Sequence, residues 1–185
     1  MSKKVLIVHG WGGSDAPHWQ AWLAGELAKD YGCVNFLRFK NVDFPHLSSW
    51  SNELLDALDD FQPEIVICHS VACTLWMHLC NEKRLKVIKH LILVAPPSMH
   101  CNIKELESFF PLIAPKTLFA QDALLIASDN DPYMDIKELK KLSNELNIKT
   151  KILKGAGHIN NESGYGEWTW LYLHFTNTLH INFSS

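Results

Sequence analysis

Short apolar runs alternate with amphipathic stretches along the chain, and this alternation constrains the fold more than any other feature. The runs are rich in β-branched residues, whereas the stretches between them carry apolar residues at the three-and-four spacing of helices. Parallel strands need connections long enough to hold a helix, so the pattern predicts an α/β protein, a three-layer α/β/α sandwich with a mostly parallel six-stranded sheet. The expected strands span 5–8, 34–39, 65–68, 91–94, 123–127 and 148–153. The expected helices span 19–29, 50–61, 73–81 and 136–146.

The length of the chain indicates the number of domains, and its charge indicates which kinds of partner to expect. Its 185 residues suit a single domain spanning 1–185, since a domain of this size buries roughly 70% of the surface that its unfolded chain exposes. A net charge of −3 provides no positive field to attract nucleic acid or an anionic membrane, so neither is an expected partner. The sequence leaves the oligomeric state open.

Targeting signals and cysteine usage both indicate a cytoplasmic protein. The apolar run after the basic start is too short for a signal-peptide core, and no run approaches the ~20 residues of a membrane span. The cysteines form no Cys-x-x-Cys pair, so reduced thiols used as small core residues are expected. They are Cys33, Cys68, Cys73, Cys80 and Cys101.

A serine stands where the third expected strand turns directly into a helix-forming run, in Cys68-His69-Ser70-Val71-Ala72. In a nucleophile elbow the serine occupies a strained backbone position, so the residues two before and two after it must be small. Ala72 meets this demand fully and Cys68 meets it in part. Ser70 is therefore the candidate nucleophile.

Acidic residues and a histidine follow the two later strands, in Ser128-Asp129-Asn130-Asp131-Pro132 and in Gly155-Ala156-Gly157-His158. The order serine, acid, histidine is that of α/β-hydrolases and differs from the chymotrypsin and subtilisin orders. His158 is the expected base, because imidazole titrates near neutrality and can take and return a proton. Asp131 is favoured over Asp129 as the acid that orients it, since Asp131 leads the chain out of the loop toward the next helix. All three candidates follow strand ends, which places them on the one sheet edge where such folds bind ligands.

Backbone N–H groups at the same edge are candidates for an oxyanion hole. Val71 supplies one by its position after the serine, and Trp11 supplies the other from the glycine-rich run His9 to Ser14. That run lacks the glycine spacing of a dinucleotide site and the lysine of a phosphate loop, so a tight turn is its other interpretation. Gly10, Trp11 and His69 are expected to contact substrate. The histidines show no His-x-x-x-His pair joined to a glutamate, so no metal or other cofactor is expected.

Motifs spread over nearly the whole chain carry a family resemblance. They are Val8 to Ser14 with His18 to Gln20, His69-Ser70, Asp131 to Tyr133, and Gly157 to Asn160 with Ser163 to Gly166 and Trp168. On these residues the chain resembles the small serine hydrolases of the α/β-hydrolase superfamily, typified by YdeN and by retinoblastoma-binding protein nine. The resemblance implies a minimal α/β-hydrolase core without a large cap domain, an esterase activity, and a triad of Ser70, Asp131 and His158. Cys68 and Ala72 depart from the glycines that are usual in the family.

Together these patterns predict a serine hydrolase, a carboxylesterase on small acyl esters that works through an acyl-Ser70 intermediate. Thioesters and small amides fit the same chemistry. A binding protein that keeps the fold as a scaffold is the alternative, because a fold does not settle function. The irregular segment 95–117 is interpreted either as a short lid over the site or as an irregular crossover.

Overall fold

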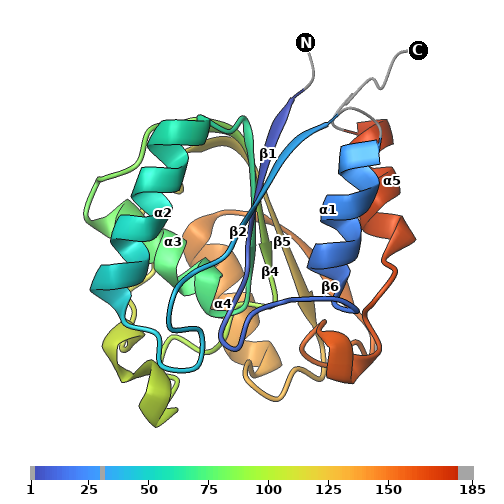
Figure 1. Ribbon diagram of the computed structural model, residues 1–185. Coiled ribbons are helices and arrows are strands. Elements are labelled where there is room, and N and C mark those ends of the chain that lie inside the picture. The colour runs from blue at the N-terminus through green and yellow to red at the C-terminus, as the bar shows by residue number, and fades with distance from the viewer. Residues whose placement is uncertain (1–2, 30–31, 179–185) are drawn as a thin grey trace.

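The computed structural model describes residues 3–29 and 32–178, in which six parallel strands form one sheet between two layers of helices (Figure 1). The sheet order is β2-β1-β3-β4-β5-β6. The strands are β1 (Lys4–Val8), β2 (Cys33–Leu37), β3 (Ile65–His69), β4 (Ile88–Val94), β5 (Ala120–Ser128) and β6 (Lys149–Leu153). The helices are α1 (Trp19–Lys29), α2 (Leu47–Phe61), α3 (Val71–Asn81), α4 (Ile136–Leu146) and α5 (Thr169–Thr178), with short 3₁₀ helices η1 (Lys104–Phe109) and η2 (Asn161–Ser163). The predicted fold class is confirmed, and the sheet is parallel throughout.

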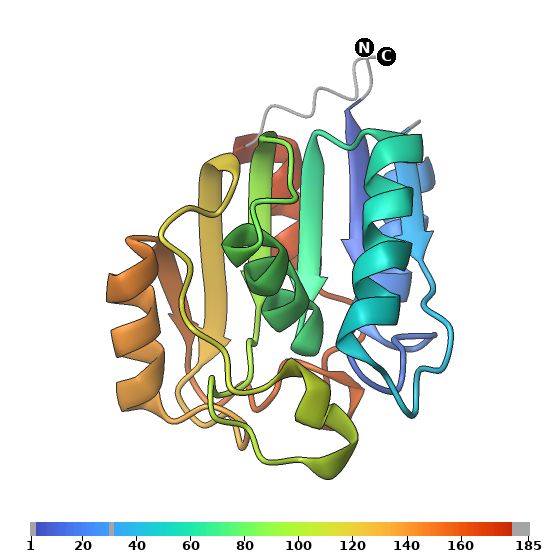
Figure 2. The same cartoon turned by 90° about the vertical axis from the view of Figure 1, so that its left-hand side faces the viewer.

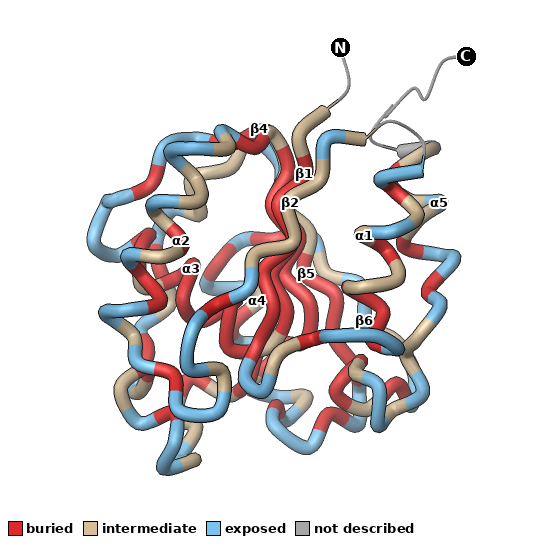
Figure 3. The backbone as a smooth tube through the Cα atoms, in the orientation of Figure 1, coloured by how far each residue is buried: buried red, intermediate tan, exposed pale blue. Residues whose placement is uncertain are grey.

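Two apolar cores lie on opposite faces of the sheet, because successive side chains of a strand point to opposite faces. On β1, Leu6 and Val8 pack in the core with α2, α3 and α4, whereas Val5 and Ile7 pack in the core with α1 and α5. Figure 1 shows the same division into layers, and Figure 3 shows the buried strands between them. Burial on both faces explains why the central strands read as continuous apolar runs rather than as alternating ones.

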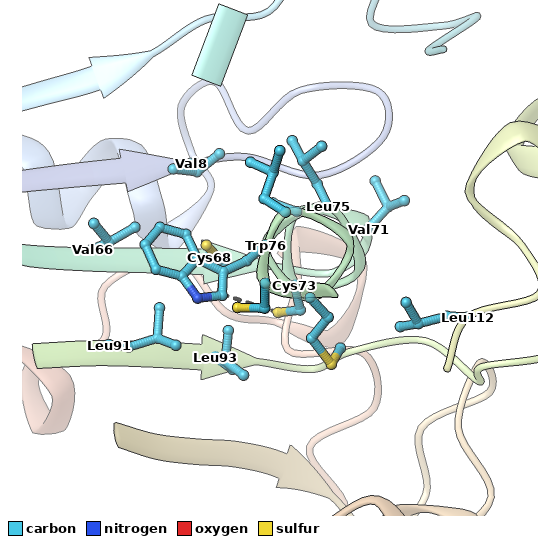
Figure 4. Packing of buried hydrophobic residues seen from close by; sticks show 14 of the residues in the cluster. Val8, Val66, Cys68, Val71, Cys73, Leu75, Trp76, Leu91, Leu93 and Leu112 are labelled. Carbon is cyan, nitrogen blue, oxygen red and sulfur yellow. Dashed lines mark hydrogen bonds between the residues drawn. The ribbon is translucent and has the colours of Figure 1, made fainter. Parts of the chain in front are cut away.

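Helix α3 is the most buried helix and begins directly after Ser70. Nine of its 11 residues are buried, and Figure 4 shows Trp76 and its neighbours packed against the strands. Cys68 lies fully buried in this core, and the Cys73 thiol donates to its carbonyl oxygen at 3.4 Å. Burial raises the pKa of both thiols, so they are neutral core groups. The cysteines are free, and Cys33 is exposed rather than in the core.

Helix α4 begins as expected at the cap residue Asp135, whose side chain accepts from the amide of Lys137 at 2.7 Å. Glu138 stands three residues after Asp135, at the position where the side chain of a capping box would reach back to the cap. The Glu138 carboxylate instead accepts from the Ser98 hydroxyl at 2.9 Å and from the Met99 amide at 2.8 Å. Glu138 therefore anchors the segment that follows β4 to α4.

The sequence did not predict α5, whose Leu171 and Phe175 are fully buried beside α1. The segment between β4 and β5 contains η1, which lies at the end of the sheet to which the strand arrows point, and then runs back to the start of β5, as Figure 2 shows. The loops after β5 and β6 lie at the same end as η1. None of the helices in the described ranges is long and apolar enough to cross a membrane.

Candidate active site

Ser70 joins β3 to α3 in a backbone conformation that L-residues seldom adopt, with φ 56° and ψ −130°. Its amide donates to the Val94 carbonyl oxygen at 2.9 Å, and its carbonyl oxygen accepts from the Cys73 amide at 2.9 Å. The turn is therefore tied to both β4 and α3. This geometry corresponds to a nucleophile elbow, which presents the serine hydroxyl at the top of the sheet.

Gly10 packs against the elbow so closely that no side chain fits there. A Cβ atom on Gly10 would lie 2.7 Å from the Ser70 Cβ and 3.1 Å from the His69 carbonyl oxygen. Its role in the structure is thus to let the loop after β1 approach the serine. Gly10 is absent from the lining of the cavity described below.

His158, Asp131 and Ser70 form a continuous hydrogen-bonded chain. The Nε2 atom of His158 lies 2.9 Å from the Ser70 Oγ. On the other side of the ring, Nδ1 lies 2.9 Å and 3.1 Å from the two carboxylate oxygens of Asp131. A carboxylate only accepts, so Nδ1 carries the proton and Nε2 is left to accept from the serine hydroxyl. Asp129 lies apart from this chain and accepts from the Gly155 amide at 2.7 Å.

The histidine loop is held against the loop after β5 by side chains that accept from successive backbone amides. The Ser128 hydroxyl accepts from Ala156 at 2.9 Å, and the Asn130 side chain accepts from Gly157 at 2.8 Å. Within the loop, the Ser163 hydroxyl accepts from the His158 amide at 3.1 Å. Ser128 and Asn130 lie in the same loop as the predicted acid Asp131, but nothing in the sequence pattern identifies them or Ser163 as groups that position the histidine.

His69 lies buried behind His158 and is held in one tautomer. Its Nε2 lies 3.1 Å from the His158 carbonyl oxygen, which can only accept, so this nitrogen carries the proton. Burial lowers the pKa of His69 well below its usual value, so the ring is neutral. His69 reaches the cavity, yet its ring nitrogen is used to hold the backbone of His158.

His9 supports the other side of the elbow in the same manner. Its Nε2 accepts from the Phe39 amide at 3.0 Å, and its Nδ1 therefore donates to the Gly10 carbonyl oxygen at 2.7 Å. Burial lowers the pKa of His9, which keeps the ring neutral and able to do both. This bond takes Phe39 out of β2, which ends at Leu37 rather than at the expected residue 39.

The backbone amides of the glycine-rich loop and of the start of α3 differ in whether they have a hydrogen-bond acceptor. In the glycine-rich loop, the amides of Gly12 and Gly13 donate to the carbonyl oxygens of Val42 and Gly10. The amides of Trp11 and Val71 have no hydrogen-bond acceptor in the described part of the chain. Val71 is the first residue of α3, where helix amides lack partners within the helix.

A cavity of about 640 Å³ opens onto Ser70 and His158. The Tyr133 ring packs edge-on against the His158 ring at 4.6 Å between centroids. Tyr133 also lines this cavity. The other apolar lining residues include Trp11, Phe44, Pro97, Ile103 and Leu106. The polar lining residues include His18, Asp43, Glu105, Asn160 and Glu162. No group of three side chains among the described residues is arranged to hold a metal ion.

A family model described as "Serine hydrolase" matches residues 5–177 of the chain. The chain belongs to the serine hydrolase family. This match and the elbow geometry agree on the hydrolase class, and the family predicted from the sequence motifs is confirmed.

Individual relatives extend the similarity to whole chains. The Bacillus subtilis (strain 168) protein named "Putative hydrolase YdeN" is 24% identical over 175 residues, which cover 89% of this chain and 90% of YdeN. The YdeN crystal structure superposes with a TM-score of 0.82 at 20% identity, covering 97% of this chain and 100% of YdeN.

More distant structures share the fold. A YdeN-like protein from Pectobacterium atrosepticum superposes with a TM-score of 0.79 at 22% identity, covering 97% of this chain and 92% of that chain. The esterase domain of a Rhodothermus marinus protein gives a TM-score of 0.62 at 13% identity, covering 92% and 87%. These neighbours show that the chain has the α/β-hydrolase fold.

Replacing Gly10 with alanine should distort the elbow, because the new methyl group would overlap the Ser70 Cβ. We expect a loss of about 1–3 kcal/mol of unfolding free energy and slower labelling of Ser70 by a fluorophosphonate. Gly25→Ala in α1 is the matched control, since a Cβ there meets no atom within 4 Å and alanine favours a helix. Wild-type labelling rates in Gly10→Ala would contradict the role assigned to this glycine.

Acid should destabilise the fold through the buried histidines. Burial, followed by the charges of His158 and His9, lowers the pKa of His18 to about 4, and burial also lowers those of His9 and His69. The unfolded chain takes up these protons near pH 6.5, so stability present above that pH is lost as pH falls toward 4. Each proton contributes about 1.4 kcal/mol per pH unit. The free energy of unfolding is measured by urea unfolding between pH 4 and 6.5 in the wild type and in His18→Gln. An equal slope of this free energy against pH in the two proteins would contradict the prediction.

Proposed function

We propose that the protein is a carboxylic-ester hydrolase that works through an acyl-serine intermediate. The observation that carries the proposal is the chain of hydrogen bonds from Asp131 through His158 to Ser70. Serine is a weak nucleophile until an oriented base takes its proton, and this arrangement meets that requirement. Similarity in fold to a Rhodothermus marinus esterase domain supports an ester as the substrate class.

Acylation begins with attack of the Ser70 Oγ on the ester carbonyl carbon, while the hydroxyl proton passes to Nε2 of His158. Asp131 stabilises the resulting imidazolium and keeps its ring in place. The amides of Trp11 and Val71 stabilise the negative charge on the carbonyl oxygen, since neither amide has a hydrogen-bond acceptor in the described part of the chain. His158 then gives its proton to the leaving alcohol as the carbon–oxygen bond breaks.

Deacylation reverses these roles with water as the nucleophile. His158 takes a proton from water, the hydroxyl attacks the acyl carbon, and the proton returns to the Ser70 Oγ as the carboxylic acid leaves. Every group in this route is a side chain or amide of the chain itself, so the proposed reaction uses no metal or cofactor. Small esters fit the cavity, and thioesters and small amides follow the same steps.

Ser70→Ala should abolish ester hydrolysis and fluorophosphonate labelling, because no other group supplies the nucleophile. A loss on the order of 10⁶ in kcat is expected from the removal of a triad serine. Ser49→Ala on α2 is the matched control and should leave both readouts intact. Labelling that survives in Ser70→Ala would contradict the proposal, and absence of labelling in the wild type would favour a binding protein.

Asp131→Asn should reduce turnover far more than Asp129→Asn. An amide at position 131 no longer selects the histidine tautomer that accepts from serine, a change that lowers kcat by about 10⁴ in the best-studied triad. Asn at position 129 keeps an oxygen that accepts from the Gly155 amide. Measurement of kcat for p-nitrophenyl butyrate in both variants tests the assignment, which fails if the change at position 129 is the more damaging.

A further inference from the structure

His18, at the start of α1, is a buried histidine that the proposed mechanism does not use. Its exposed fraction is 6%, yet it forms part of the cavity wall. The Nδ1 atom accepts from the Gln20 amide at 3.2 Å, so the neutral ring carries its proton on Nε2. Nε2 has no hydrogen-bond partner among the described residues.

The ring is neutral and fixed in place. Burial, followed by the charges of His158 and His9, lowers the pKa of His18 to about 4. The ring packs against both Trp19 and His69, with centroid distances of 5.6 Å and 5.0 Å. Nε2 is not among the atoms that are both fully buried and unpaired, and His18 lines the cavity, so this fixed donor is accessible to an acceptor on a bound ligand.

Polar and apolar side chains both line the cavity. Ile103 and Leu106 line it from the segment that packs on the core with α2 and α3, and the acidic Glu105 lies between them in the sequence. His18 and Asn160 line it from the side of α1 and α5. Figure 1 shows the segment with η1 and the loop after β6 at opposite sides of the same sheet edge. Ser70 lines the same cavity as His18 and Asn160, so one arm of an ester bound at Ser70 can extend toward these polar side chains.

We propose that His18 is a substrate-binding residue whose Nε2–H donates to an ether, hydroxyl or carbonyl oxygen on the polar arm of the ester. The proposal rests on the proposed esterase activity and deepens it by naming a substrate class, esters with a second oxygen beyond the reacting carboxyl group. This donor is separate from the amides of Trp11 and Val71, which would hold the oxyanion. The bond forms with bound substrate before any charge develops, so its loss should raise KM more than it lowers kcat.

The test compares ester pairs that differ by one oxygen in place of one methylene. For the acyl arm the pair is p-nitrophenyl methoxyacetate and p-nitrophenyl butyrate, together with longer pairs in which the ether oxygen moves along the chain. For the alcohol arm the pair is 2-methoxyethyl butyrate and n-butyl butyrate. The ratio of kcat/KM within a pair is measured in wild type and in His18→Leu, and division of the two ratios cancels the intrinsic reactivity of the esters.

We expect the preference for the oxygen-containing ester to fall about tenfold in His18→Leu on one of the two arms, which identifies that arm. His18→Gln is the matched variant, because its side-chain amide restores a donor near the position of Nε2, and it should recover much of the preference. Unchanged ratios on both arms in His18→Leu, or equal losses in the Leu and Gln variants, would overturn the proposal.

Two further measurements keep the result interpretable. Urea unfolding and fluorophosphonate labelling report whether each variant is folded with a reactive serine. If His18→Leu fails to fold, the wild type and His18→Gln still test the proposal. Wild-type rates that favour no oxygen-containing ester after division by the hydroxide-catalysed rates would then overturn it. Absence of Ser70-dependent hydrolysis in the wild type would instead overturn the proposed function, so the two failures are distinct.

Discussion

The left-handed backbone of Ser70 is the constraint on which the rest of the site depends. A non-glycine residue in such a conformation costs on the order of 1–3 kcal/mol, so the surrounding structure must hold it there. Hydrogen bonds to Val94 and Cys73 join the turn to a central strand and to α3. The burial of α3 in the larger apolar core stabilises the helix that the turn begins. Gly10 is small because the loop after β1 must pass directly against this turn.

The partners of Ser70 lie on loops, so hydrogen bonds rather than regular structure determine their positions. Side chains after β5 accept from successive amides after β6, and this ladder brings Asp131 and His158 within hydrogen-bond distance. His69 and His9 fix the backbone on either side, and His9 does so only as a neutral ring because its Nε2 accepts from the Phe39 amide. The geometry of the site and the acid stability of the fold therefore depend on the same buried imidazoles.

The sequence predicts the sheet well because its central strands are buried on both faces and so form continuous apolar runs. It does not predict α5, because Leu171 and Phe175 are buried while Trp170 and Leu173 are partly exposed, which hides the helical period. Helix α2 begins three residues before the expected 50, at a turn capped by the side chain of His46 rather than by a usual capping residue. The bounds of a helix with an unusual cap, or the existence of one with exposed aromatic residues, become clear only from its tertiary contacts.

At the site, the order of serine, acid and histidine along the chain points to the loops that the structure brings together, but composition cannot distinguish two aspartates in one turn. Only distances show that Asp131 reaches the histidine ring while Asp129 binds a backbone amide. The segment between β4 and β5 posed a similar question, lid or crossover. Glu138 ties its start to α4, and the rings of His78 and Trp76 bond the carbonyl oxygens of Phe109 and Leu118. The crossover is thus anchored at both ends, and its residues Ile103 and Leu106 both pack on the core and line the cavity. Substitutions at such lining positions can therefore change substrate choice without a change in the sheet.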